Sequence, residues 1–331
     1  MPTNKQVLLA ARPKGAVRET DFKIVDTETP ALKEGEVLVQ VHFLSLDPYM
    51  RGRMDDAKSY AASVEVGAVM TGGTVGKVVE SKNPKFAAND TVLAMFGWQQ
   101  YGVSDGRGLQ KIDTSVLPMS VYLGCVGMPG VTAWYGLKQI GAPKAGETVA
   151  VSAASGAVGS VVGQLAKTMG CRAVGVAGGR AKCDYVVKEL GFDACVDYKA
   201  GNLEADLKAA APKGIDVYFD NVGGEVLDTV FRQLNAFARI PLCGLISGYG
   251  GEVYPLRNYR SLLTNRVHLQ GFIVSEHMEI WPQALQELGA GVASKRIKYR
   301  ESVAQGLENA PRAFMGMLKG ENFGKQLVKL I

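Results

Sequence analysis

The sequence has 331 residues, enough for about two domains. Hydrophobic residues make up 47% and charged residues 21% of the chain, a balance that is typical of a globular protein and excludes a disordered one. The net charge of +5 is mild and comes without a run of basic residues, so it does not indicate a nucleic-acid-binding protein.

Targeting signals and cysteine usage favour a cytoplasmic protein. No apolar stretch reaches the roughly eighteen residues that a membrane helix needs, and the first residues do not resemble a secretory signal. The five cysteines are scattered and odd in number, with no Cys-x-x-Cys pair, as is usual in a reducing compartment. We therefore expect no membrane association.

Short strands separated by turns fill the chain from residue 5 to about residue 120. Alternation and β-branched residues predict strands at 36–43, 75–80 and 91–96. The strand-like C-terminal segment does not extend the sheet that follows, so we expect it to return to these strands. The prediction is a mostly antiparallel, β-barrel-like domain over residues 1–124, completed by residues 297–331.

From about residue 124 the pattern changes to strand, glycine turn and helix, repeated several times. Strands are predicted at 148–152, 172–177, 194–198, 215–220, 239–246 and 267–274. Helical stretches are predicted at 181–190, 225–237 and 281–293. Such alternation predicts an α/β domain of the Rossmann type, a doubly wound parallel sheet over residues 125–296.

The first turn of this α/β domain carries small residues at Ala154, Gly156 and Gly159. The spacing is that of a dinucleotide-binding fingerprint with alanine in the first glycine position. It follows the predicted strand 148–152 and precedes a helix, where backbone N–H groups and the helix dipole favour a pyrophosphate. We expect the pyrophosphate of a dinucleotide at Gly156, Ala157, Val158 and Gly159.

The end of the second strand indicates which dinucleotide binds. Gly179 stands twenty positions after Gly159, where NAD-binding chains usually have an acidic residue, and no acid occurs between Arg172 and Asp184. Arg180 and Lys182 follow instead, and a small neutral pocket with cations suits a 2′-phosphate. The alternative is that both are solvated surface cations. This pattern favours NADP(H) over NAD(H).

Four segments spread over nearly the whole chain carry a resemblance to a known family. They are Asp47–Arg51, Gly127–Ala133, Asp220–Gly224 and Phe314–Lys325. In combination they resemble the zinc-independent medium-chain dehydrogenase/reductase superfamily, in its leukotriene B4 dehydrogenase, prostaglandin reductase and 2-alkenal reductase group. Ser59-Tyr60 before Val64–Gly67, and the run Leu307–Pro311, are similar to the bacterial curcumin-reductase branch of that group. The resemblance implies a GroES-like substrate domain at the N-terminus.

The metal ligands of the zinc-dependent relatives have no counterpart in this sequence. No cysteine precedes Cys125, and His42, His268 and His277 lie far from any partner at ligand spacing. Each histidine is better explained as a strand or surface residue. We therefore expect no metal, which removes the usual mechanism of alcohol dehydrogenation.

NADP(H) can instead reduce an activated alkene, because hydride addition to the β-carbon of an enone leaves negative charge on the carbonyl oxygen. That oxygen needs a hydrogen-bond donor. Tyr249, in the glycine-rich loop 244–251 after the fifth predicted strand, is the candidate, and the resemblance implies a functional tyrosine at this position. The alternative is an aromatic lid that only packs on the cofactor or the substrate.

Further site residues are expected along the carboxyl edge of the sheet or follow from the resemblance. Asn221, Cys243, Gly244, Phe272, Ile273 and Val274 follow predicted strands or end them and are expected to contact the cofactor. The resemblance implies that Tyr198 meets the 2′-phosphate with Lys182 and that Asn322 reaches the cofactor, although Asn322 also suits a turn. Tyr49 and Tyr60 are substrate-binding candidates, with a core or surface role as the alternative for each.

The sequence thus predicts an NADPH-dependent reductase of the conjugated C=C bond of α,β-unsaturated ketones and aldehydes, acting on a small-molecule enone or enal. The alternatives are an NADPH:quinone reductase and a non-catalytic NADPH-binding protein. The apolar segment 267–272 is expected at a sheet edge, where pairing across two chains would make a homodimer.

Overall fold

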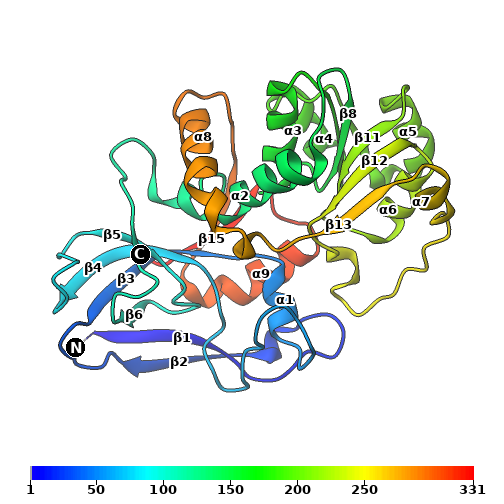
Figure 1. Ribbon diagram of the computed structural model, residues 1–331. Coiled ribbons are helices and arrows are strands. Elements are labelled where there is room, and N and C mark those ends of the chain that lie inside the picture. Colours follow the sequence, from blue (N-terminus) through cyan, green and yellow to red (C-terminus); the bar gives the residue numbers. More distant parts are fainter. Residues whose placement is uncertain (1) are drawn as a thin grey trace. The chain divides into compact units, whose positions relative to one another are not determined.

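The computed structural model describes residues 2–331, which form two compact units (Figure 1). Unit 1 holds the residues up to Leu123 together with Glu301–Asn322 and Gln326–Ile331. Unit 2 holds Gly124–Arg300 and Phe323–Lys325.

Unit 1 is built mainly from antiparallel strands. β1 (Thr3–Leu9) and β2 (Phe22–Glu28) form a two-stranded sheet. A seven-stranded sheet has the order β14-β15-β3-β4-β5-β7, with β6 paired to β3. Its strands are β3 (Val37–Ser45), β4 (Thr74–Ser81), β5 (Thr91–Ala94), β6 (Tyr101–Ser104), β7 (Gln110–Lys111), β14 (Glu301–Gln305) and β15 (Lys325–Lys329). The C-terminal strand β15 thus pairs antiparallel with β3, with Leu327 opposite Ser45.

An aromatic cluster anchors the core of unit 1. The ring of Trp98 stacks on Phe22 at 5.4 Å between centroids and meets the edge of Phe314 at 5.6 Å. Phe314 lies on α9 (Ala310–Leu318), so the C-terminal segment supplies part of this core. The other α-helix of the unit, α1 (Tyr49–Arg53), directly follows Pro48.

Unit 2 contains a six-stranded parallel sheet with the order β10-β9-β8-β11-β12-β13. Its strands are β8 (Thr148–Ser152), β9 (Arg172–Ala177), β10 (Ala194–Asp197), β11 (Ile215–Phe219), β12 (Leu234–Leu242) and β13 (His268–Gly271). The chain proceeds outward from β8 to β10, then returns to the other side of β8 and proceeds to β13. This is the doubly wound Rossmann order, and it confirms the predicted fold class.

Helices connect these strands and cover the sheet (Figure 1). They are α2 (Met128–Tyr135), α3 (Gly159–Thr168), α4 (Arg180–Lys188), α5 (Leu203–Ala210), α6 (Gly224–Phe231), α7 (Arg260–Thr264) and α8 (Trp281–Ala293). Leu207 of α5 and Phe231 of α6 share one buried cluster with Ala150, Val174 and Val176 of the strands. On these strands every second residue faces α5 and α6, as a parallel sheet covered by helices requires.

The sequence predicted the end of the helix before β12 and the start of β12 itself wrongly. The helix predicted over 225–237 ends at Phe231, and the chain is already in β12 at Leu234, where Leu234 is opposite Ile215. Phe237 then takes a left-handed φ of 62°, and the register of β11 and β12 shifts there. A strand with such an irregularity loses the strict alternation that sequence reading depends on.

The predicted strands 239–246 and 267–274 also end early. β12 stops at Leu242 because the N–H groups of Cys243 and Gly244 both donate to the carbonyl oxygen of Asp220. β13 stops at Gly271, and a 3-10 turn covers Val274–Glu276.

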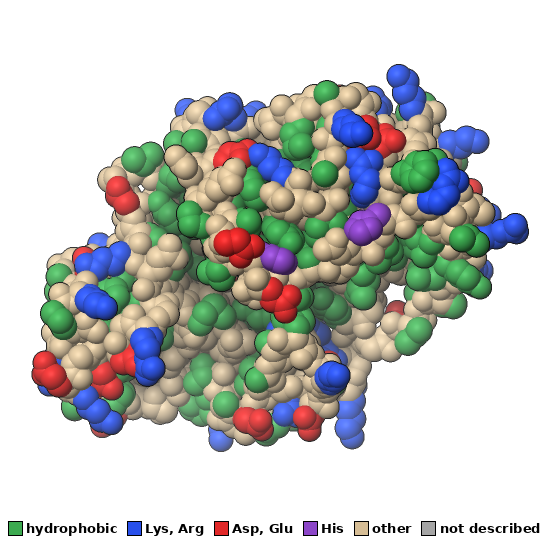
Figure 2. All heavy atoms as spheres, in the orientation of Figure 1, with side chains coloured by type: hydrophobic (Ala, Val, Ile, Leu, Met, Phe, Trp, Pro, Cys, Tyr) green, Lys and Arg blue, Asp and Glu red, His purple; other side chains and the backbone are tan. Residues whose placement is uncertain are grey.

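Basic and acidic side chains are interspersed over the face of the molecule in Figure 2. Among the described residues, no helix is long and apolar enough to cross a membrane.

Candidate active site

The turn between β8 and α3 forms a tight glycine-dependent cradle. Ala153 takes a left-handed φ of 50°, and a Cβ on Gly159 would lie 2.4 Å from its carbonyl oxygen. No side chain larger than hydrogen therefore fits at Gly159. The N–H of Gly156 donates to the Ala153 carbonyl at 2.8 Å, which closes the turn. The N–H groups that follow, from Ala157 to Gly159, lead into the start of α3, where a helix offers donors to an anion.

Alanine takes the first position of the fingerprint because the neighbouring strand makes room for it. Ala154 is fully buried, and a Cβ on Gly175 of β9 would lie 2.7 Å from the Ala154 Cβ. The fingerprint thus has alanine instead of glycine at position 154, and the glycine at position 175 of the neighbouring strand leaves space for its methyl group.

The segment Phe323–Lys325 lies against this turn within unit 2. The N–H of Gly324 donates to the Ser155 carbonyl at 3.1 Å, and Gly324 forms a parallel bridge with Gly156. A Cβ on Gly324 would lie 1.9 Å from the Arg300 carbonyl oxygen, so glycine is required there too. The Phe323 ring lies 4.1 Å from the Arg300 guanidinium carbon and 6.0 Å from Lys182 Nζ.

Cationic side chains gather at the ends of β9 and β10. A Cβ on Gly178 would lie 3.0 Å from the Tyr198 hydroxyl and 3.1 Å from Cε of Lys199, which places both side chains over this glycine. Lys182 is half-buried, and burial together with the nearby Lys199 lowers its pKa. Two ammonium groups that repel each other next to a tyrosine hydroxyl fit a phosphate group.

The acidic side chain of Asp197, at the end of β10, accepts hydrogen bonds from backbone N–H groups. Asp197 Oδ1 accepts from the N–H of Gly179 at 2.7 Å and from the N–H of Lys199 at 3.0 Å. Arg180 lies at the start of α4 and lines a pocket beside β10 together with Asp197.

The buried carboxylate of Asp220 organises the carboxyl edge of the central strands. Its Oδ1 accepts from Ser152 Oγ on β8 at 3.1 Å and from the Tyr218 hydroxyl on β11 at 2.9 Å. The N–H groups of Val222 and Gly223 donate to the same oxygen, each at 3.0 Å. Burial raises the pKa of Asp220, although these four donors act against it.

Asn221, Gly244 and Tyr249 come together at this edge. Asn221 Nδ2 donates to the Ser152 carbonyl at 2.9 Å. A Cβ on Gly244 would lie 3.3 Å from the Asn221 carbonyl oxygen and 3.9 Å from the Tyr249 hydroxyl oxygen. The Tyr249 hydroxyl therefore faces the end of β12. Burial raises the pKa of Cys243, in the same turn, to about 12, so this thiol stays protonated.

The residues after β13 are placed by packing inside unit 2. The Phe272 ring meets the edge of Phe219 at 6.2 Å and lies 5.5 Å from the ring of Tyr135. Val274 is buried, and its carbonyl accepts from Trp281 Nε1 at 3.2 Å. Ile273, between them, is partly buried.

Tyr49 and Tyr60 are brought together within unit 1 by a buried arginine. The Arg53 guanidinium carbon lies 5.9 Å from the Tyr49 ring centroid and 4.3 Å from that of Tyr60. Arg53 Nη1 donates to the Ala61 carbonyl at 2.6 Å, which holds the segment of Tyr60 in place. Burial, followed by Asp47 and Tyr60, raises the pKa of Tyr49, so its hydroxyl remains a donor at neutral pH. Asn322 also belongs to unit 1, whereas the next residue, Phe323, belongs to unit 2.

Sequence reading did not single out four residues that shape these groups: Arg53, Lys199, Asp220 and Phe323. Lys199 could have been found from its place beside Tyr198, because both follow the end of a predicted strand. Asp220 was visible only as part of a family segment. Nothing in the sequence indicates that the Phe323 ring packs against Arg300 and Lys182.

Among the described residues no group of three His, Cys, Asp or Glu side chains is arranged to hold a metal ion. Residues 5–112 match a family described as the N-terminal domain of oxidoreductase, and residues 157–290 match one described as zinc-binding dehydrogenase. The chain is 46% identical to the NADPH-dependent curcumin reductase of Escherichia coli, over 99% of this chain and 97% of that protein.

Another relative is the 2-alkenal reductase (NADP(+)-dependent) of Nicotiana tabacum, 43% identical over 98% of this chain and 97% of that protein. The crystal structure of CurA in complex with NADPH from Vibrio vulnificus is similar with a TM-score of 0.95 and 46% identity, covering 99% of both chains. The chain belongs to the medium-chain dehydrogenase/reductase superfamily. Within that superfamily it falls in the group of the curcumin, prostaglandin and 2-alkenal reductases, as the sequence predicted.

Proposed function

We propose that the protein is an NADPH-dependent reductase that saturates the conjugated C=C bond of α,β-unsaturated ketones and aldehydes. The observation that carries this proposal is the arrangement in unit 2, where the glycine cradle, the Lys182–Lys199 pair and the Tyr249 hydroxyl follow strands β8, β9, β10 and β12 of one sheet. The relatives named above are NADP(H)-dependent reductases of curcumin and of 2-alkenals, which supports it.

The residues of unit 2 fit NADPH. The donors of the cradle suit a pyrophosphate, and the lysine pair beside Tyr198 suits a 2′-phosphate better than a free hydroxyl. The residues that we propose for cofactor binding are Gly156, Ala157, Val158, Gly159, Arg180, Lys182, Tyr198, Lys199, Asn221, Cys243, Gly244, Tyr249, Phe272, Ile273, Val274 and Asn322.

When bound, NADPH supplies a hydride for the β-carbon of the enone. The hydroxyl of Tyr249 donates a hydrogen bond to the substrate carbonyl oxygen, where negative charge develops as the enolate forms. A donor placed for the developing charge lowers the barrier more than it strengthens ground-state binding. Tyr49 and Tyr60 are the proposed substrate-binding residues of unit 1, and the raised pKa of Tyr49 keeps its hydroxyl a donor at neutral pH.

The Tyr249→Phe variant tests this assignment. We expect kcat for an enone to fall on the order of 10²-fold, because one donor to the developing oxyanion is lost. The dissociation constant of NADPH, measured by fluorescence titration, should stay within about twofold, because an aromatic ring remains at position 249. NADPH deuterated at C4 should label the saturated product of the native enzyme at the β-carbon.

Tyr254→Phe is the matched control, since it removes a hydroxyl from an exposed tyrosine nearby in the chain, and it should turn over like the native protein. Unchanged enone turnover in Tyr249→Phe contradicts the role of Tyr249. Faster NADPH oxidation with quinones than with any enone contradicts the proposed substrate class. Tight NADPH binding without turnover of any acceptor supports a non-catalytic protein instead.

We further propose that the protein acts as a homodimer in the cytoplasm. None of the five cysteines forms a disulfide in the described part of the chain, although two of them are in direct contact, and this suits a reducing compartment. The exposed edge strand β13 supports the dimer.

A further inference from the structure

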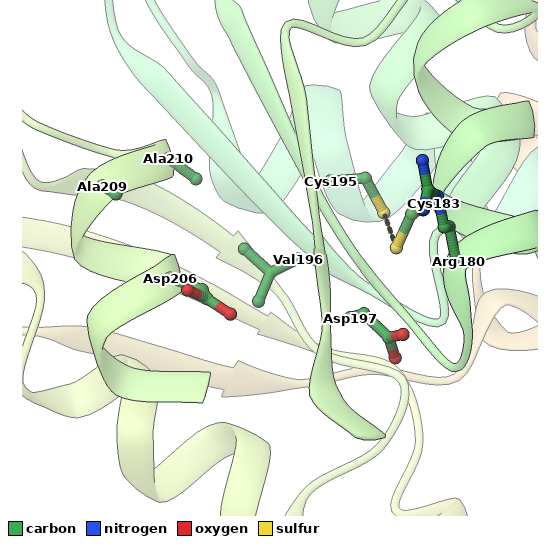
Figure 3. A pocket seen from close by; sticks show the side chains of 8 residues that line it. All are labelled: Arg180, Cys183, Cys195, Val196, Asp197, Asp206, Ala209 and Ala210. Atoms are coloured by element: carbon green, nitrogen blue, oxygen red, sulfur yellow. Dashed lines mark hydrogen bonds between the residues drawn. The ribbon is translucent and has the colours of Figure 1, made fainter. Parts of the chain in front are cut away.

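Two free cysteines of unit 2 lie in direct contact. Cys183 on α4 and Cys195 on β10 have their sulfur atoms 3.0 Å apart, and the Cys195 thiol donates to the Cys183 sulfur (Figure 3). A disulfide bond is about 2.05 Å long, so the two sulfurs need to approach by only about 1 Å to form one. The reductase chemistry does not use either thiol.

The two thiols differ in reactivity. The hydrogen bond from Cys195, with a smaller effect from the backbone of Ala177, lowers the pKa of Cys183. The same hydrogen bond, with burial, raises the pKa of Cys195. Since the thiolate is the nucleophile, Cys183 reacts first and Cys195 keeps its proton until a second step.

A pocket beside β10 borders this pair, of which Cys195 is partly exposed and Cys183 is buried. It has a volume of about 400 Å³ and is bordered by both cysteines, Arg180, Val196 and Asp197, with helix α5 on the far side (Figure 3). This volume exceeds what a hydroperoxide needs. Burial and the carboxylates of Asp197 and Asp184 act against the hydrogen bond from Cys195, since each raises the pKa of Cys183.

The pair also joins the two elements that carry the phosphate-binding cations. α4 begins at Arg180 and bears Lys182 one residue before Cys183. β10 ends at Asp197, two residues after Cys195, and the Asp197 carboxylate holds the N–H groups of Gly179 and Lys199. A bond between residues 183 and 195 therefore moves both sides of the 2′-phosphate pocket relative to each other.

We propose that Cys183 and Cys195 form a hydroperoxide-reactive thiol pair whose oxidation to a disulfide weakens NADPH binding. The Cys183 thiolate attacks one peroxide oxygen, the O–O bond breaks, and the other oxygen leaves as an alcohol or water after taking up a proton. Cys195 then attacks the sulfur of the sulfenic acid, the S–O bond breaks, and water leaves with the Cys195 proton. Two electrons pass from the thiols to the peroxide.

The test treats the reduced native protein, without cofactor, with hydrogen peroxide. We expect two of the five thiols to be lost and a digest to yield one peptide pair joined through Cys183 and Cys195, reversibly with dithiothreitol. The effect on the cofactor rests on the proposed function. We expect the NADPH dissociation constant to rise about 5-fold or more, with a smaller change for NADH.

Variants separate this chemistry from general oxidative damage. Cys195→Ala, with Cys195→Ser as a second variant, should stop at a sulfenic acid that dimedone traps on Cys183. Cys171→Ser, which changes another buried cysteine of unit 2, should form the disulfide like the native protein. Absence of the 183–195 crosslink overturns the proposal, and a crosslink that leaves NADPH affinity unchanged overturns its effect on the cofactor. Failure of the reduced protein to bind NADPH contradicts the proposed function instead.

Discussion

At the scale of single residues, the half-buried Lys182 is the side chain on which we propose that coenzyme choice depends most. Burial and the charge of Lys199 lower the pKa of Lys182. The second effect shows that the two ammonium groups repel each other. A 2′-phosphate between them relieves that repulsion, whereas a 2′-hydroxyl does not. We therefore expect discrimination between NADPH and NADH to come from relief of this repulsion as well as from attraction to the phosphate.

Lys182→Ala should therefore weaken NADPH binding by about 1.5–3 kcal/mol, the worth of a charge-assisted hydrogen bond. Lys199→Ala should have a smaller effect, because Lys199 is exposed and solvent screens its charge. Fluorescence titrations with NADPH and NADH measure both constants, and NADH affinity should barely change. Lys188→Ala, at the other end of α4, is the matched control. An equal loss of NADH affinity in Lys182→Ala would show that the lysine does not recognise the 2′-phosphate.

Sequence reading could single out Lys182 because the signal is local, and the role of this residue in coenzyme choice stays a prediction. The absence of acids and the presence of Lys182 follow directly from counting along the chain after Gly159. Counting residues along the chain does not show what the carboxylate of Asp197 binds. A carboxylate does lie beside the pocket, but it is bound to the N–H groups of Gly179 and Lys199, and only the fold reveals that pairing.

At the scale of elements, the ends of β8, β11 and β12 are held in register by one residue, Asp220. Its side chain binds Ser152 of β8 and Tyr218 of β11, and its backbone carbonyl accepts from Cys243 and Gly244 after β12. The loop that carries Tyr249 begins directly after this junction. The carboxylate is therefore a positioning group for the proposed donor.

Asp220→Ala should destabilise the protein by about 3 kcal/mol, because buried donors are left without their acceptor. Asp220→Asn keeps an acceptor oxygen and should remain folded. Urea unfolding followed by circular dichroism measures both changes. Loss of less than about 1 kcal/mol in the alanine variant would show that the network relaxes around the gap.

The pH dependence of the asparagine variant provides a further check on the same residue. Burial raises the folded-state pKa of Asp220 above its ordinary value of 3.8, so the folded protein binds this proton more tightly than the unfolded chain. The stability that the tighter binding of this proton gives to the folded protein is fully present below the pKa of Asp220 in the unfolded chain. It is lost as the pH rises through the pKa of Asp220 in the folded protein. Stability of Asp220→Asn relative to the native protein should therefore increase from acid to neutral pH. A constant difference would contradict the raised pKa.

The elements whose bounds were predicted best are short apolar runs with clear turn residues at both ends. β8 and β9 have the predicted bounds, since both are short apolar runs between turn residues. The helix predicted over 225–237 failed because an apolar helix end and an irregular apolar strand have the same composition. Only the pairing of Leu234 with Ile215 distinguishes the two, and that contact is not local in sequence.

At the scale of the whole molecule, β13 is the feature that supports the proposed homodimer. It lies at the edge of the six-stranded sheet, and all four of its residues are exposed. Leu269 is 38% exposed in the middle of the strand. Native proteins usually prevent pairing at such an edge with proline, a bulge or a charged side chain. The segment His268–Gly271 contains no proline and no Lys, Arg, Asp or Glu.

Antiparallel pairing of β13 with its copy about a two-fold axis would satisfy the free edge and continue the sheet across both chains. We expect the native protein to sediment at twice the chain mass of 35.3 kDa at micromolar concentration. Leu269→Asp should shift the mass toward the monomer, because two like charges meet near the axis where apolar surface was buried. Val116→Asp, at an exposed valine of unit 1, should leave the mass unchanged. A native protein that sediments as a monomer, or a Leu269→Asp variant that stays dimeric, would show that β13 does not form the interface.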